Sequence, residues 1–339
     1  MNEQELLEAA RHGDEEAFGR LIAPYRAELH AHSYRMLGSV HDAEDAMQDT
    51  LLRAWRGLAR FEARSSLRSW LYKIATNTSL KVIERRPRRV LPLDYGPPAD
   101  PHDDLSERLA ESTWVEPYAD ERLGLEDGLA GPEARYEQRE SVELAFIAAL
   151  QHLPPRQRAV LILRDVLGFS AREVADVLDT TPPAIDSALQ RAHKTAGTRL
   201  PDRSQQATLR ELGDTGLREI VTKYVDAWER RDVGAVVAML TDDAVLTMPP
   251  RPTWYRGRES VAVFLTRLPL APGSRWRLVP ARANAQLAFG EYLWDRDVEA
   301  FVPHAVNVLT LRSEQIADIT AFLTPELFAQ FGLPDQIRP

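Results

Sequence analysis

The sequence predicts a multidomain fold in which two all-α blocks precede a C-terminal α+β block. Over residues 1–86, and again from about 138 to 200, apolar residues recur at three- and four-residue spacing, as in amphipathic helices. A proline-rich, acidic stretch separates these two blocks. From residue 204 onward, a helical segment is followed by short runs typical of β-strands, at 275–282, 305–311 and 315–322. The 339 residues are enough for two or three domains.

The amino-acid composition excludes several classes of function. The chain has no cysteine, which excludes disulfides, thiolate metal sites and a cysteine nucleophile. The N-terminal residues are acidic and polar, unlike a secretory signal, and no apolar run approaches the roughly 18 residues of a membrane helix. We therefore expect a cytoplasmic protein with no membrane partner.

Charge is distributed very unevenly. The formal net charge is −9, yet residues 52–89 hold eleven basic and two acidic residues, whereas 90–140 hold four basic and fourteen acidic residues. A block with a net charge of +9 is sufficient to face nucleic-acid phosphates. The alternative interpretation is a solvated helix face.

The segment 151–200 has the pattern of a helix-turn-helix. Ser170 and Glu173 have the spacing of a capping box, the polar turn 179–181 follows, and Thr181 is placed to cap a second helix with Pro182 in its first turn. The outward face of that helix is predicted to consist of Thr181, Pro183, Asp186, Ser187, Gln190, Arg191 and Lys194. Such a helix enters the major groove, where Gln190 suits adenine and Arg191 suits guanine or phosphate. An ordinary helical hairpin is the alternative.

Together, the two helical blocks resemble bacterial sigma factors of the extracytoplasmic-function (ECF) type, group IV of the sigma-70 family. DAEDAMQDTLLRAW (42–55) and FEARSSLRSWLYKIATN (61–77) are similar to sigma region 2, and LPPRQRAVLILRDVLGFSAREVADVL (153–178) is similar to region 4. The resemblance implies region 2 over 1–89, an acidic linker over 90–137 that we expect to be mobile, and region 4 over 138–203.

The resemblance also implies partners and contact residues. The helix from 42 would bind the clamp helices of the largest subunit of core RNA polymerase through Asp45, Gln48, Asp49, Leu52 and Arg56. The next helix would read and melt the promoter −10 element through Phe61, Arg64, Ser65, Ser66, Arg68, Lys73, Asn77 and Lys81. Region 4 would bind the −35 element and the polymerase flap. Asp186 and His193 stand where basic residues are usual, so we expect an unusual −35 specificity.

The block from 204 to 339 resembles the SnoaL-like, nuclear-transport-factor-like cone, a curved sheet wrapped by helices. The matching features are Tyr224 and Trp228 on one helix and the segments 240–245 and 255–259. Aromatic residues expected to line or fill the cone are Trp228, Trp254, Tyr255, Phe264, Trp276, Phe289, Tyr292 and Trp294.

Some relatives of this cone are enzymes that use an acidic or histidine base. The candidate groups Asp243, Glu291, Asp295 and His304 form no pair at a catalytic spacing. We therefore expect no catalytic residue, metal or cofactor, and a cone that regulates the sigma regions in cis. The alternative is that the cone senses an unidentified small molecule or acts as a cyclase- or isomerase-like enzyme.

The linker motif WVEPYAD (114–120) is similar to one found in sigma factors that carry this cone. Its aromatic residues need a burial site, so we predict that Trp114, Pro117, Tyr118 and Asp120 contact the cone. The hypothesis is that linker and cone hold regions 2 and 4 in a compact state unable to bind DNA, which makes a separate anti-sigma factor unnecessary. A disordered linker is the alternative.

Overall fold

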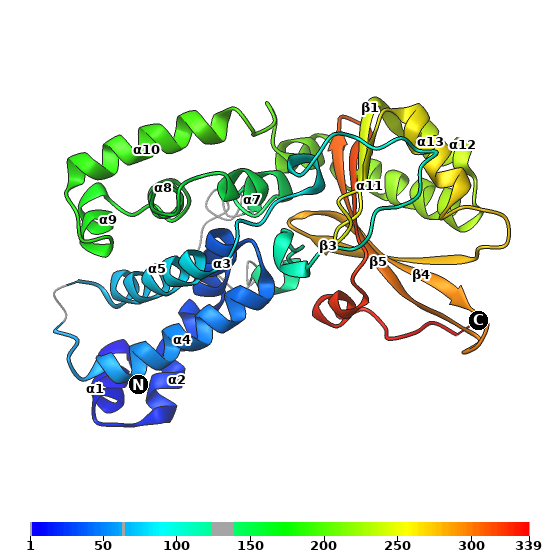
Figure 1. Cartoon of the computed structure of the whole chain (residues 1–339). Helices are drawn as coiled ribbons and strands as arrows, with labels where there is room; N and C mark the ends of the chain where they lie inside the picture. Colours follow the sequence, from blue (N-terminus) through cyan, green and yellow to red (C-terminus); the bar gives the residue numbers. More distant parts are fainter. Residues whose placement is uncertain (1, 63–64, 124–138, 339) are drawn as a thin grey trace. The chain divides into compact units, whose positions relative to one another are not determined.

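A computed structural model describes residues 2–62, 65–123 and 139–338 (Figure 1). The chain divides into two compact units. The first contains 1–89 and 121–200, so both predicted sigma regions belong to it. The second contains 90–120 and 201–339. Within the described ranges, no helix is long and apolar enough to cross a membrane.

The N-terminal part of the first unit is a helical bundle. Its helices are α1 (Glu3–Arg11), α2 (Glu15–Ile22), α3 (Arg26–Leu37), α4 (Val40–Leu58) and α5 (Leu67–Arg85). Polar side chains of Asn2, Asp14, Ser39 and Ser66 accept the first free amides of α1, α2, α4 and α5. The apolar stripe predicted for α4 faces the bundle, with Ala43, Ala46, Ala54 and Leu58 buried.

The C-terminal part of the first unit is a second helical group. It contains α7 (Leu144–Gln151), α8 (Pro155–Leu161), the π-helical turn η5 (Ile162–Val166), α9 (Ala171–Val177) and α10 (Pro182–Gly197). The capping box of Ser170 and Glu173 is confirmed at the start of α9. The cap predicted for Thr181 is wrong: Thr181 precedes α10, but its side chain makes no capping hydrogen bond.

The second unit contains a six-stranded sheet with helices packed on it (Figure 1). The helices are α11 (Gln205–Glu229), α12 (Val233–Ala238) and α13 (Arg258–Arg267). The strands are β1 (Leu240–Thr247), β2 (Trp254–Arg256), β3 (Trp276–Ala283), β4 (Gln286–Asp295), β5 (Ala300–Arg312) and β6 (Gln315–Phe322), and the short helix η6 (Pro325–Phe331) follows. The strand order is β2-β1-β6-β5-β4-β3, and only the β1–β6 pairing is parallel.

One strand of this unit differs from the sequence-based expectation. Strand β4 was not predicted, because its first seven residues are all buried and show no polar–apolar alternation. Helix α11 begins at Gln205 after the N-cap Ser204. Gln205 and Gln206 are buried, and their amides bond the backbone at Leu311 and Ala285.

Residues 90–120 of the predicted linker, which we call the strap, belong to the same compact unit as the cone. Their mobility stays a prediction. Ala99 and Leu109 donate backbone hydrogen bonds to the carbonyls of Trp254 and Pro250, and the Trp254 indole donates to Gly96. Residues 124–138 of the predicted linker lie outside the described residues.

Candidate functional site

The solvent-facing side of α4 carries every residue predicted to bind polymerase. Asp45, Gln48, Asp49, Leu52 and Arg56 are all exposed. Leu52 keeps 53% of its surface in solvent, with Asp49 three residues before it and Arg56 four residues after it on the same helix. Asp49 also pairs with Arg53 at 3.0 Å, an exposed ion pair that contributes little to stability. This face is available to a partner and is not needed for the core.

The predicted −10 residues divide into buried and exposed groups. Phe61 is buried and packs on Trp70, with ring centroids 5.0 Å apart, so it belongs to the core of this conformation. Ser65, Ser66 and Lys81 are exposed, whereas Asn77 is half-buried. Arg64 lies outside the described residues.

Two further predicted −10 residues on α5, Arg68 and Lys73, contact region 4. The Arg68 guanidinium lies over the rings of Tyr72 and Phe169, 5.1 and 4.8 Å from their centroids. Lys73 Nζ donates to the Asp179 carboxylate and to the Asp176 carbonyl, both at 2.7 Å. Ser69, beside these residues, donates to Glu173 at 3.5 Å. In this conformation, region 4 contacts two cationic side chains that were predicted to face −10 DNA.

Helix α10 presents its predicted DNA face to solvent. Ile185, Ala192 and Ala196 are buried. The predicted −35 residues Thr181, Pro183, Asp186, Ser187, Gln190, Arg191 and Lys194 are all exposed. His193 pairs with Asp165, so it is tied to the domain itself.

The cone interior holds a buried polar cluster among apolar side chains. Glu291 on β4 is 3% exposed and accepts a hydrogen bond from the Asn307 amide, which also lies 3.3 Å from the Tyr224 hydroxyl. Burial raises the pKa of Glu291 well above its ordinary value, because the charged form loses its hydration inside the cone.

The other candidate catalytic groups of the cone are separate from this cluster. Asp243 is exposed and forms an ion pair with Arg312 at 2.9 Å. His304 packs on Trp276 with ring centroids 5.1 Å apart, and burial lowers its pKa. Asp295 accepts backbone hydrogen bonds in the turn that follows β4. No cluster of three potential metal ligands occurs in the part of the chain that the structure describes.

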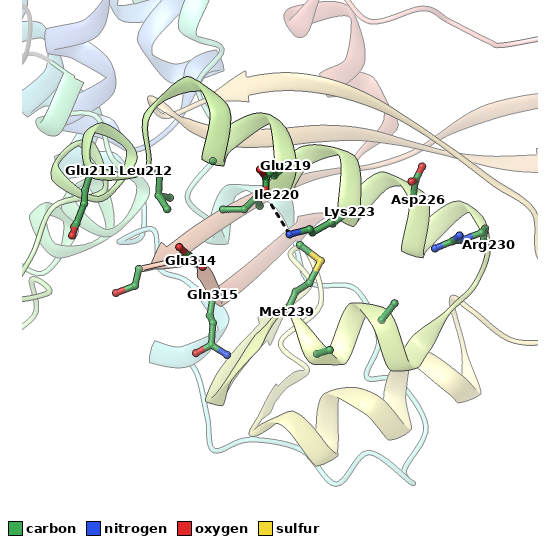
Figure 2. A pocket seen from close by; sticks show the side chains of 14 residues that line it. Glu211, Leu212, Glu219, Ile220, Lys223, Asp226, Arg230, Met239, Glu314 and Gln315 are labelled. Carbon is green, nitrogen blue, oxygen red and sulfur yellow. Dashed lines mark hydrogen bonds and ion pairs between the residues drawn. The ribbon is translucent and has the colours of Figure 1, made fainter.

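A hollow of about 950 Å³ lies in the second unit between α11, α12 and the β5–β6 turn (Figure 2). Carboxylates and cations alternate on its wall, and Lys223 and Glu219 approach to 3.5 Å. None of the eight aromatic residues expected in the cone lines this hollow. Five of them instead form part of the hydrophobic core: Trp228, Tyr255, Phe264, Trp276 and Phe289.

The raised pKa of Glu291 predicts a specific pH dependence of stability. From about pH 4.5 up to the raised pKa, the folded state holds one proton more than the unfolded state. The free energy of unfolding therefore falls as pH rises, by up to about 1.4 kcal/mol per pH unit. Glu291→Gln removes this contribution, so its Tm should exceed that of wild type at pH 8 and converge with it near pH 4. Thermal unfolding from pH 4 to 9 measures the difference. The exposed Glu314→Gln is the control; an unchanged wild-type slope in Glu291→Gln would contradict the assignment.

The strap meets the cone at the turn between β3 and β4. Tyr118, which is fully buried, donates its backbone N–H to the Asn284 side chain at 2.9 Å, and its carbonyl accepts from the Asn284 N–H at 2.8 Å. The Asp120 carboxylate accepts from the Ala285 N–H at 2.7 Å. The sequence did not single out Asn284; a positive φ of 55°, which asparagine tolerates well, explains its place in this turn.

The two ends of the strap are tied together. Val90 donates to the Thr113 carbonyl at 2.9 Å, and Val115 donates to the Val90 carbonyl at 3.1 Å. Trp114 is buried next to Tyr95, with ring centroids 5.8 Å apart. About 25 residues are thereby removed from the span that separates region 2 from region 4.

Comparison with known proteins agrees with this architecture. Family models match Sigma-70 region 2 over residues 21–89, Sigma-70 region 4 over 143–195 and a SnoaL-like domain over 221–319. These matches define a sigma-70 type transcription factor with an added SnoaL-like domain.

Among similar proteins, the ECF RNA polymerase sigma factor SigG of Mycobacterium tuberculosis is 42% identical over 329 residues, which cover 96% of this chain and 86% of SigG. The RNA polymerase sigma-H factor of Pseudomonas aeruginosa is 28% identical over 209 residues, covering 62% of this chain and 96% of that factor. The chain belongs to the ECF RNA polymerase sigma factors and is an alternative sigma factor.

A solved structure shares the fold. The crystal structure of the extracytoplasmic-function sigma factor SigJ of Mycobacterium tuberculosis matches with a TM-score of 0.57 and 21% identity, covering 91% of this chain and 97% of SigJ. The predicted order of two helical sigma regions followed by an α+β cone is confirmed.

Proposed function

We propose that this sigma factor binds core RNA polymerase through the exposed face of α4 and directs it to promoters through α5 and α10. The observation that carries the proposal is the α4 face, where Leu52 lies exposed among Asp45, Gln48 and Asp49. An apolar side chain inside a charged rim is typical of the centre of a protein interface. The exposed residues of α10 have the chemistry needed to read base edges in the −35 duplex.

We further propose that regions 2 and 4 form a closed, DNA-incompetent state held by the strap. Lys73 pairs with Asp179, and Arg68 packs on the ring of Phe169. A cation that is paired in this way cannot bind a DNA phosphate at the same time. Tying the strap ends shortens the tether between the regions and raises their effective concentration for one another. Because the strap is bonded to the cone, the cone regulates the sigma regions in cis and no separate anti-sigma factor is required.

In the open state, regions 2 and 4 are separated. A partner shifts the protein toward this state only if it binds the open state more tightly than the closed one. Core polymerase meets this condition if it takes region 2 and region 4 at separate surfaces. A small molecule bound by the cone is a second source of such a shift; the buried Glu291–Asn307 cluster is the feature that favours it. The cone has no assigned catalytic residue in this proposal.

Run-off transcription with purified core polymerase tests the sigma function. The template is the upstream region of the gene itself, and the full chain is compared with core enzyme alone. A specific transcript is expected only with the chain. Gln190→Ala or Arg191→Ala should lower output from that promoter by roughly 5- to 150-fold, the value of one base contact of about 1–3 kcal/mol.

A matched control variant tests whether the loss of output reflects lost promoter recognition and not a general loss of folding or stability. Arg172→Ala changes an exposed arginine on α9, outside the predicted −35 face, and should leave output within about twofold of wild type. The absence of a specific transcript on any tested template, from correctly folded chain, would overturn the proposed function.

A further inference from the structure

A cavity of about 250 Å³ in the first unit is lined by four arginines. Arg86, Arg88 and Arg89 follow the end of α5, and Arg158 comes from α8, so the wall combines region 2 and region 4. Among the described residues of the lining, Asp42 is the one acidic residue. The described lining therefore carries three more positive than negative charges.

Asp42 pairs with two of these arginines. Its Oδ1 accepts from Arg86, and its Oδ2 accepts from Arg89 Nη2 at 2.9 Å. Asp42 and Arg89 are both buried, whereas Arg86 is half-exposed. One carboxylate thus balances one of two neighbouring guanidinium groups, and nothing of its hydrogen-bonding capacity is directed at Arg158.

Arg158 is a buried cation that forms no ion pair with any residue in the described part of the chain. Its guanidinium donates to the Gln151 side chain at 2.6 Å and to backbone carbonyls, including that of Leu153 at 3.4 Å. Every acceptor that Arg158 has in the described part of the chain is neutral. Its Nε is buried and makes no hydrogen bond. Burial and the charge of Arg88 lower its pKa to about 9, so it is still charged at pH 7.

A buried charge is costly unless an opposite charge balances it. The excess of positive charge in the described lining, and the neutral acceptors of the Arg158 guanidinium, favour an anion with several acceptor oxygens as the occupant. We propose that this cavity is a binding site for a small phosphate-type oxyanion, held between Arg88 of region 2 and Arg158 of region 4. Arginine forks match the oxygens of phosphate groups, which suits this chemistry.

The volume of the cavity limits the size of the anion that it can hold. Sites for drug-sized ligands span roughly 300–1,000 Å³, and this cavity of about 250 Å³ is smaller. Inorganic phosphate or pyrophosphate fits the volume better than a complete nucleotide. Because the ligand would contact both regions, it would also stabilise the packing of region 4 on region 2.

The test uses the full chain with potassium phosphate and with pyrophosphate, titrated at constant ionic strength set by potassium chloride. Calorimetry should give saturable binding of about one anion per chain, and Tm should rise with ligand concentration. Arg88→Ala should weaken binding at least tenfold, the loss of one charge-assisted contact. Arg85→Ala, an exposed arginine of the same segment outside the cavity lining, should change affinity less than twofold.

Arg158→Gln should weaken binding as strongly as Arg88→Ala. If Arg158→Gln does not fold, the comparison of Arg88→Ala with Arg85→Ala still decides the matter, because both positions are exposed. Equal losses in Arg88→Ala and Arg85→Ala, or no saturation at 10 mM anion, would overturn the site. Displacement of phosphate by one equivalent of single-stranded −10 DNA would assign these arginines to a DNA backbone and also overturn it. The assay contains no polymerase, so its outcome is independent of the proposed transcription activity.

Discussion

Reversing charge at Asp45 and Asp49 together, by Asp45→Lys and Asp49→Lys, should reduce promoter-directed transcription by roughly 100-fold or more. Each carboxylate is expected to face a basic group of the polymerase, and losing a close charge pair at an interface costs about 2–5 kcal/mol. The cost in stability should be small, because both residues are exposed and the Asp49–Arg53 pair is a surface ion pair. Run-off transcription and core-binding affinity measure the effect.

Two controls test whether the loss of transcription is specific to polymerase binding. Binding of the −35 duplex should be unchanged in the double variant, since α10 is untouched. A control with the same change in charge, Glu15→Lys with Glu16→Lys on the exposed side of α2, should keep at least half of the wild-type activity. Normal transcription by the Asp45, Asp49 variant would show that α4 is not the polymerase-binding surface.

Loosening the strap should raise promoter DNA binding by the free sigma factor. Asn284→Gly removes the oxygen that accepts from Tyr118 N–H and leaves that buried donor unpaired, a loss of about 1–3 kcal/mol. Glycine accepts the φ of 55° at this position without strain, so the turn itself is preserved. If the strap holds the closed state, the open population should rise about tenfold, within a range of roughly 5- to 150-fold.

Fluorescence anisotropy with a promoter fragment measures the opening, and limited proteolysis of 90–120 reports release of the strap. Ser313→Gly is a matched control, because Ser313 has the same φ of 55° in a turn of the cone that makes no contact described for the strap. Protease sensitivity that rises in Asn284→Gly without any gain in DNA binding would contradict an inhibitory strap. A fall in transcription with stronger proteolysis would instead show that the strap supports the active conformation.

The sequence by itself determined the helical regions and their exposed faces. The caps at Ser39, Ser66 and Ser170, the buried stripe of α4 and the outward face of α10 depend on residues within a few positions of one another. Helix periodicity and capping are local, so they can be read without knowing what lies across the fold. The two sigma regions, and the cone that follows them, were predicted correctly for this reason and because their motifs resemble known families.

Tertiary structure decided the features that depend on distant partners. Strand β4 lacks alternation because both of its faces are covered, and Asn284 becomes an anchor only when Tyr118, 166 positions away in the chain, reaches it. The charge of Arg158 is likewise unremarkable in the sequence and becomes informative only once the guanidinium is buried among neutral acceptors, while Asp42 of the same cavity pairs with Arg86 and Arg89. Whether a side chain is buried, and what it pairs with, depends on residues that are distant in the sequence. Local sequence patterns do not reveal those residues.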